Sequence, residues 1–223
     1  MRIKTMQGGF LHILYALIFF TINLSSLTGF SQPGFNPMKN QDQFKRALKQ
    51  TTQSTITMES KFVQEKNLSV ITEKITSHGS FFFKQENKLR WEYSDPFRYL
   101  IIINGDKVYV KDESKESHFD ASSNKVFAEI NSILVACIRG TILENDKQFS
   151  FDFLENTDSY LLKLHPLATR LKNSIAEIRI FLNKKNYSVS RLEMHEPSGD
   201  FTKIQFMDLK INKPVTDENF RIN

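Results

Sequence analysis

Histidine and cysteine, which often carry catalytic or metal chemistry, are few in this 223-residue chain and lie far apart. Histidine occurs five times, at positions 12, 78, 118, 165 and 195, and no two have a metal-ligand spacing such as H-x-H or H-E-x-x-H. The sequence has no C-x-x-C, no G-x-S-x-G and no glycine-rich phosphate loop. We therefore expect a protein that is not an enzyme, with no catalytic residue, no metal and no cofactor.

The one cysteine and the many acidic residues leave two further chemical options. Cys137 lies in the apolar stretch 133–138, which favours a small buried side chain over a nucleophile. A single cysteine also cannot form an internal disulfide. Carboxylates that oppose each other across strands cannot be found from sequence, so an enzyme that uses such a pair remains an alternative. That alternative predicts a polar cleft.

Aromatic residues are the chemical feature that stands out. The chain has 20 Phe and one Trp, and several lie close together, as in Phe81-Phe82-Phe83 and Phe149-x-Phe151-x-Phe153. On a strand, Phe81 and Phe83 share one face while Phe82 takes the other. Such residues form either a Phe-rich core or the wall of a cavity for acyl chains, which gain about 0.8 kcal/mol for each CH₂ buried.

Most of the chain alternates with the two-residue period of antiparallel strands. Asn104-Gly105-Asp106 is a strong hairpin signal, because Asn and Gly tolerate positive φ. No repeat or linker divides the chain. The expected strands are 54–63, 70–77, 79–84, 89–93, 99–103, 107–111, 149–154, 159–165, 175–182, 189–195 and 201–209, with 220–222 as a final edge segment.

Two segments have helical spacing instead. Residues 42–53 form a short amphipathic helix with Phe44, Ala47 and Leu48 on one side, and residues 124–138 carry a broad apolar stripe. We expect a mainly β protein of the α+β class: a strongly curved antiparallel sheet or unclosed barrel, with an N-terminal helix and a central helical lid. The stripe on 124–138 suits a lid and ordinary core packing equally well.

The first 31 residues have the pattern of a cleaved signal peptide. Arg2 and Lys4 precede an apolar run, 10–24, that is shorter than the roughly 20 residues needed to span a bilayer. Gly29 and Ser31 fit a cleavage site after Ser31, and an uncleaved anchor is the alternative. Lipidation at this site would need a cysteine, and none lies near it. Residues 32–223 then form a single exported domain. Its net charge falls from +5 to +3, because residues 1–31 hold two basic and no acidic side chains, and we expect no nucleic-acid binding.

An ordered set of short motifs resembles the LolA family of periplasmic outer-membrane lipoprotein carriers. The motifs are Phe62-Val63-Gln64, the strand Gly79 to Lys84, the segment Leu89-Arg90-Trp91-Glu92-Tyr93 before Pro96, and the hairpin from Asn104 to Val110. Each is weak alone, but their order and spacing together are specific. The match is good from about Phe44 to Lys111.

The resemblance implies an unclosed barrel whose helices cover a hydrophobic cavity. The cavity would receive lipoprotein acyl chains from an inner-membrane lipoprotein-releasing ABC transporter and pass them to an outer-membrane acceptor, without a cofactor. The carrier would be a periplasmic monomer. Phe81 and Phe83 match wall positions on one strand, and Leu89 and Trp91 match cavity-side positions on the next. The other expected cavity residues are Phe62, Tyr93, Ile101, Ile130 and Leu134.

One departure from the family concerns the lid. Many members have Arg-Pro just after the strand lysine, and that Arg hydrogen-bonds the lid backbone, whereas this chain has Gln85 followed by Glu86. Gln85 is the expected latch position, but a neutral donor makes a weaker bond than a charged one. A carrier of another envelope lipid or glycolipid therefore stays open, as does an envelope structural or interaction protein with a solid core.

Overall fold

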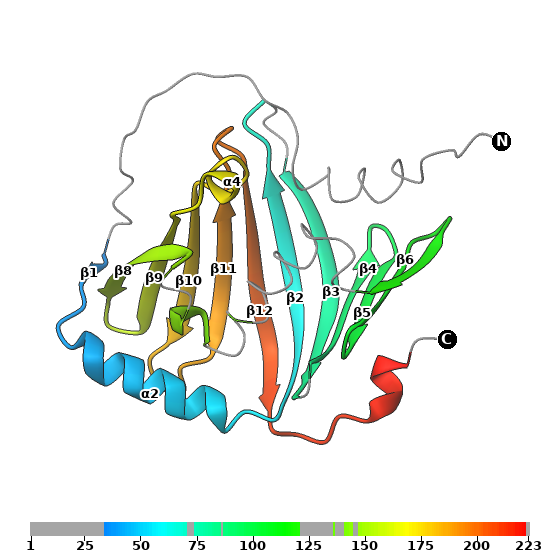
Figure 1. Cartoon of the computed structure of the whole chain (residues 1–223), viewed down its shortest axis with the longest axis horizontal. Helices are drawn as coiled ribbons and strands as arrows, with labels where there is room; N and C mark the ends of the chain where they lie inside the picture. Colours follow the sequence, from blue (N-terminus) through cyan, green and yellow to red (C-terminus); the bar gives the residue numbers. More distant parts are fainter. Residues whose placement is uncertain are drawn as a thin grey trace.

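The computed structural model describes residues 34–70, 74–85, 87–120, 136, 141–144 and 147–221. Its strands are antiparallel and form one sheet in the order β1-β8-β9-β10-β11-β12-β2-β3-β4-β5-β6-β7. The two edge strands, β1 and β7, do not pair with each other in that order, so the sheet curves without closing (Figure 1). The elements are β1 (Asn36–Pro37), α2 (Gln41–Gln53), β2 (Thr57–Asn67), β3 (Lys74–Lys84), β4 (Lys88–Asp95), β5 (Tyr99–Asn104), β6 (Lys107–Lys111), β7 (Glu116–Asp120), η2 (Thr141–Glu144), β8 (Phe149–Glu155), β9 (Ser159–Pro166), α4 (Thr169–Lys172), β10 (Glu177–Asn183), β11 (Val189–His195), β12 (Phe201–Ile211) and η3 (Asp217–Phe220).

The predicted fold class, a mainly β unclosed antiparallel sheet with an N-terminal helix, is confirmed. The predicted strands 70–77 and 79–84 are wrong as separate elements, because the chain runs through Gly79 as one strand, β3. The final segment is also not an edge strand. Phe220 instead ends the short helix η3, and β7 forms that edge of the sheet.

The sheet is held together at its centre by strands from the two ends of the chain. β12 pairs with β2 over most of its length, with Phe206 opposite Phe62 and Thr202 opposite Lys66. The register shifts between Met207 and Lys210, where Asp208 has a φ of 54°. This bulge lies at the end of the sheet where α2 crosses below the strands (Figure 1).

Helix α2 closes that end of the sheet. The side chain of Asn40 caps it by accepting a hydrogen bond from the Gln43 backbone N–H at 3.1 Å. Phe44 and Leu48, four residues apart on one face, are buried. The ring of Phe44 packs edge-on against Tyr160 of β9 at 4.6 Å, so the predicted amphipathic helix 42–53 is confirmed and faces the β8–β11 half of the sheet.

The main core lies on the inner face of the curve. Buried residues from β2 to β6 and from β8 to β12 belong to one apolar cluster, which is possible only if both halves of the sheet bend toward each other. The opposite face of β9 to β12 and β2 carries ion pairs beside the buried Leu161 and Phe181. Arg179 lies 3.7 Å from Glu193, and Lys203 lies 3.3 Å from Glu65.

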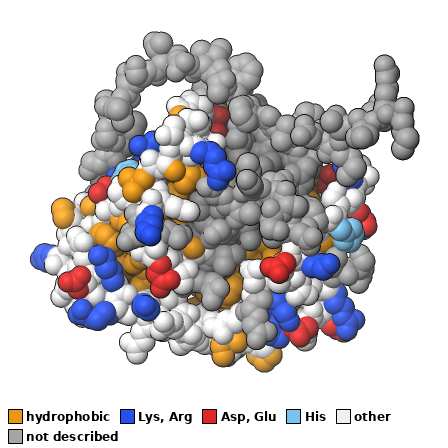
Figure 2. Space-filling view, in the orientation of Figure 1, with side chains coloured by type: hydrophobic (Ala, Val, Ile, Leu, Met, Phe, Trp, Pro, Cys, Tyr) orange, Lys and Arg blue, Asp and Glu red, His pale blue; other side chains and the backbone are white. Residues whose placement is uncertain are grey.

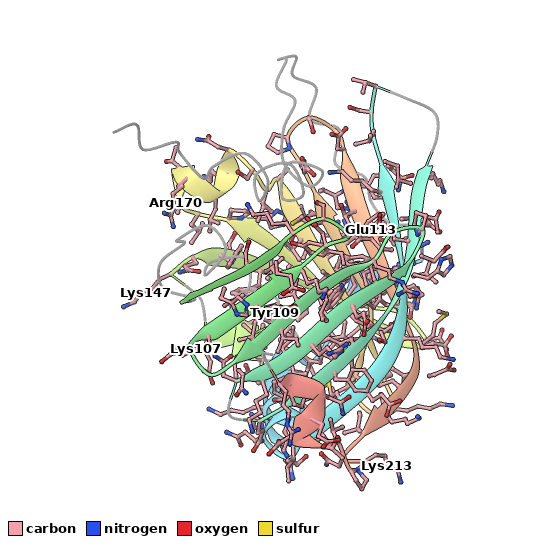
Figure 3. The ribbon with its side chains drawn as sticks, turned by 90° about the vertical axis from the view of Figure 1, so that its right-hand side faces the viewer. Lys107, Tyr109, Glu113, Lys147, Arg170 and Lys213 are labelled. Carbon is pink, nitrogen blue, oxygen red and sulfur yellow. The ribbon has the colours of Figure 1, made fainter. Side chains whose placement is uncertain are left out.

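The chain end forms a second, smaller apolar layer on the outer face of β4 to β6. Phe220 is fully buried against Ile102 and Tyr109, with Val215 packed beside them. We call Val215 and η3 the C-terminal clasp. Figure 3 shows η3 on the viewer's side of the sheet, below Tyr109 of β6. The Asp217 carboxylate accepts hydrogen bonds from Lys84 at 2.8 Å and Lys88 at 3.1 Å, which fixes the clasp to β3 and β4.

Candidate functional site

Most of the predicted cavity residues meet in the main cluster on the inner face. Phe62, Phe81, Phe83, Leu89 and Trp91 are buried in it, each less than 5% exposed, and the structure brings all five together. Tyr93 and Ile101 are partly buried and pack against it. Ile130 and Leu134 lie outside the described residues.

Strand register explains why these side chains share a face. Phe81 of β3 lies opposite Trp91 of β4, which lies opposite Ile101 of β5. The neighbouring row places Phe83 opposite Leu89. Because side chains on a strand alternate between faces, these rows form one continuous apolar surface on the inner side of the sheet.

Four aromatic rings form the centre of this surface. The rings of Phe62 and Trp91 lie 4.5 Å apart, and Phe81 meets Trp91 edge-on at 5.5 Å. Phe206 of β12 lies 6.2 Å from both Phe81 and Trp91. These edge-on and tilted contacts are the geometries that aromatic rings prefer. We call Phe62, Phe81, Trp91 and Phe206 the aromatic wall.

Phe206 is a wall residue that sequence reasoning missed. Its strand was expected, and its alternation with Ile204 and Thr202 could have indicated one face. The sequence carries no signal that β12 lies beside β2, more than 130 residues earlier, so the contact of Phe206 with the wall could not be inferred.

Gly79 makes room for the ring of Phe62, which lies directly across from it on β2. A Cβ atom at position 79 would lie 2.4 Å from Cζ of Phe62 and 2.1 Å from the Glu92 carbonyl oxygen. Any side chain would therefore displace the ring or the β4 backbone. This close approach is the reason that a glycine lies inside a long central strand.

Tyr93 adds a polar atom at the margin of the wall. Its hydroxyl donates to Oε1 of Gln64 at 2.9 Å, and burial raises the pKa of Tyr93 to about 12. The phenol therefore stays neutral at physiological pH. Hydrogen bonds with the side chains of Trp91 and Gln64 act on this pKa in the opposite direction, more weakly than burial.

A small cavity opens beside the wall at the end closed by α2. Its lining includes Phe81 and Phe206 of the wall, Met58 of β2 and Leu48 of α2, together with the turn between β10 and β11. Its volume is about 30 Å³, room for one or two waters, since one needs roughly 10–15 Å³. A cavity of this size does not hold an acyl chain, so the side chains that line it must separate before one can bind.

Gln85, the predicted latch position, is bound to the connection between α2 and β2. Its side-chain Nε2 donates to the Thr55 carbonyl at 2.9 Å, and its backbone N–H donates to the Ile56 carbonyl at 2.8 Å. Of the predicted lid 124–138, only Ala136 is described; it is helical and buried in the main cluster. The role of Gln85 as a lid latch stays a prediction.

Outside this surface, the described residues contain no group of three or more His, Cys, Asp or Glu placed to hold a metal ion. None of the described helices is long and apolar enough to cross a bilayer. Figure 2 shows apolar side chains gathered over the β8–β10 side of the face seen in Figure 1, bordered by lysine, arginine and acidic residues.

Comparison with known proteins agrees with this geometry. A family model described as "Outer membrane lipoprotein carrier protein LolA" matches residues 53–223. An outer-membrane lipoprotein carrier protein of Xanthomonas axonopodis is 29% identical over 149 residues, which cover 66% of this chain and 68% of that protein. One from Methylococcus capsulatus is 23% identical over 177 residues, 79% and 81% of the two chains. An uncharacterized conserved protein of Thermus thermophilus has a similar fold, with a TM-score of 0.53 at 8% identity, covering 82% of this chain and 94% of that one.

Proposed function

This chain belongs to the LolA family of outer-membrane lipoprotein carrier proteins, and on that premise we propose that it binds the acyl chains of lipoproteins against its aromatic wall. It would then carry them from the inner to the outer membrane. The observation that carries the proposal is the continuous apolar surface on the inner face of an unclosed sheet. Such a surface offers area without directional bonds, which is what a hydrocarbon chain needs.

The size of the cavity implies that loading opens the structure. At about 30 Å³, the cavity beside Phe81 and Phe206 cannot hold a long chain. The boundary on the side of α2 is held by side-chain hydrogen bonds to the connection after the helix, from Gln85 to the Thr55 carbonyl and from Asn212 to the Ser54 carbonyl. Such a bond contributes on the order of 1 kcal/mol, less than burying two CH₂ groups of a ligand. Burial of a long acyl chain can therefore offset the loss of these few contacts.

The remaining parts of the proposal follow from the family and from the N-terminal sequence. Residues 1–31 act as a cleaved signal peptide and residues 32–223 as one carrier domain in the periplasm. The chain works as a monomer, without catalysis or a cofactor. An inner-membrane ABC transporter supplies the lipoprotein and an outer-membrane acceptor receives it.

A matched pair of substitutions tests the proposal, because Phe81 and Phe82 are adjacent but face opposite sides of β3. Protein produced from the full chain is titrated with a fluorescent palmitoyl probe. Phe81→Ser should weaken binding about tenfold, since it removes most of one wall ring. Phe82→Ser, the control, should leave the affinity unchanged. No binding by the unsubstituted protein, or an equal loss in both variants, would refute a cavity at the wall.

The small cavity also favours a second candidate, an envelope structural or interaction protein with a solid core. This candidate predicts that the palmitoyl probe does not bind and that Phe81→Ser and Phe82→Ser differ only in stability. A carrier of another lipid or glycolipid predicts binding of the probe without a preference for lipidated peptides. Mass spectrometry of protein isolated from the cell envelope would identify a bound lipid directly.

A further inference from the structure

The inner face of the sheet changes character at the end opposite α2. Beyond the aromatic wall, the strands carry Lys66 on β2, Thr202 on β12, and Glu196 and Asp200 beside the turn between β11 and β12. We call these four residues the polar end. The tops of β2, β11 and β12 lie side by side in Figure 1, far from α2.

Register and alternation place this polar end on the same face as the wall. Lys66 lies directly opposite Thr202, four residues along β2 from Phe62. Thr202 is likewise four residues before Phe206 on β12, with Ile204 between them on that face. Both pairs are separated by an even number of residues, so the side chains point to the inner side.

Two side-chain atoms of the polar end are buried without a hydrogen-bond partner. Thr202 is 3% exposed, and within the described residues its Oγ1 has no partner. Oε1 of Glu196 is buried and unpartnered in the same part of the molecule. Buried polar groups in proteins are nearly always hydrogen-bonded, because a missing hydrogen bond is costly. We therefore expect a polar group of a ligand to bond these two atoms.

The charges of the polar end indicate what kind of group would fit. Lys66 is buried and faces the carboxylates of Glu196 and Asp200, and burial lowers the pKa of Lys66 while it raises that of Glu196. The Asp200 carboxylate accepts hydrogen bonds from the Ser69 backbone N–H and hydroxyl, both at 2.7 Å. The polar end has two carboxyl groups and one lysine, and this balance of charge disfavours binding of a phosphate. A hydroxyl and a carboxyl oxygen suit a neutral group that both donates and accepts, such as an amide.

We propose that the polar end binds the uncharged amide and ester groups at the junction between acyl chain and peptide, while the chain lies along the aromatic wall. This inference rests on the proposed function and specifies which part of the cargo is recognised. The inner face is long enough for an acyl chain to lie along it. A strand rises about 3.3 Å per residue, so the stretch of β2 from Lys66 to Ser60 extends about 20 Å, which is close to the length of a long acyl chain.

The test uses three probes that carry the same sixteen-carbon chain on different heads. They are an N-palmitoyl dipeptide amide, palmitoyl lysophosphatidylglycerol and hexadecyl glucoside. The full chain should bind the dipeptide amide roughly tenfold more tightly than the lysophospholipid, the effect of one or two hydrogen bonds and avoided charge repulsion. Equal or tighter binding of the lysophospholipid would overturn the proposal. Equal binding of the glucoside would assign the site to sugar hydroxyls and also overturn it.

A matched pair of variants locates the effect at the polar end. Thr202→Val keeps the shape and removes the hydroxyl, and it should weaken binding of the dipeptide amide roughly fivefold without changing that of the lysophospholipid. Thr76→Val, at an exposed position on β3, should change neither. A loss for both probes in Thr202→Val would overturn the assignment.

The melting temperature of Thr202→Val should equal or exceed that of the unsubstituted protein, because an unpartnered buried hydroxyl is removed. Glu196→Gln provides a second variant, should the valine variant fold poorly: it should weaken binding of the dipeptide amide, because a neutral acceptor makes a weaker hydrogen bond, and strengthen that of the lysophospholipid, because one negative charge is removed. Binding of the lysophospholipid and glucoside but not the amide would overturn the polar-end proposal alone. Failure of all three probes to bind would instead refute the proposed function.

Discussion

Two apolar clusters lie back to back on the strands β3 to β6, and they differ in what completes them. The aromatic wall on the inner face borders a cavity, which Phe81 and Phe206 help to line. The cluster on the outer face is completed by the chain itself, through Phe220 of the C-terminal clasp. A cluster that is closed by its own chain contributes to stability, whereas one that borders a cavity can bind a ligand.

Hydrogen bonds from side chains to backbone carbonyl groups hold the boundary of both clusters. The clasp is fixed by side chains that bond its backbone, with Asn104 donating to the Phe220 carbonyl at 3.2 Å and Arg90 to the Asn219 carbonyl at 3.4 Å. At the cavity, the connection after α2 is held through Gln85 and Thr55. Because the outer cluster is completed by the chain and the wall borders a cavity, we expect substitutions in the clasp to change stability and substitutions in the wall to change binding.

The largest effect is expected from Phe220→Ala. The fully buried ring would leave a cavity between Ile102 and Tyr109, and the free energy of unfolding should fall by about 4 kcal/mol. Urea unfolding measures this change. Phe97→Ala, at a 40% exposed position, is the control and should stay close to the unsubstituted protein. Folded Phe220→Ala protein should still bind the palmitoyl probe normally; a selective loss of binding would contradict the division between the two clusters.

The next largest effect concerns the wall. Trp91→Asp should weaken binding of the palmitoyl probe about 100-fold, because an ionised carboxylate beside hydrocarbon is costly. The sheet should remain folded, because the separation of the wall that the proposed loading requires also lets water reach the carboxylate. Circular dichroism and probe titration measure the two outcomes. Trp91→Phe is the control and should retain most of the affinity. Global unfolding of Trp91→Asp would assign this residue to a packed core.

The smallest effect is expected for the pH dependence of the C-terminal clasp. Hydrogen bonds from Lys84 and Lys88 hold the pKa of Asp217 below its ordinary value of 3.8. A carboxyl group whose pKa is lowered by folding stabilises the protein above its unfolded pKa, and this contribution is lost as the pH falls through the folded pKa. The melting temperature should therefore fall slightly more between pH 5 and pH 3 in the unsubstituted protein than in Asp217→Asn. Glu218→Gln should behave like the unsubstituted protein, and identical profiles for all three would exclude this role of Asp217.

Local pattern was sufficient to predict much of this molecule. The alternation of Phe81, Phe82 and Phe83 assigned their faces correctly, because a strand has a fixed two-residue period whatever it pairs with. The amphipathic helix at 42–53 was found for a similar reason, since its apolar spacing is a property of the segment itself. The five buried residues predicted for the cavity lie in one cluster.

Predictions failed where a neighbour from elsewhere in the chain decided the outcome. A break between two strands was expected just before Gly79, but β3 continues through this position, and the ring of Phe62 on β2 fills the space that the missing side chain leaves. Phe220 was expected on an edge strand, but the layer of Ile102 and Tyr109 gives it a buried site in η3. In both cases a non-local contact outweighed the local preference of the segment.

The sequence by itself determined which side chains share a face of each strand, where the chain turns, and how much aromatic surface is available for an apolar ligand. Only the tertiary structure decided that β12 lies beside β2, which adds Phe206 to the wall and sets Thr202 against Lys66. It also decided that the outer cluster is completed by the chain end. The physical reason is that periodicity depends on the backbone of one segment, whereas pairing depends on the free energy of bringing distant segments together.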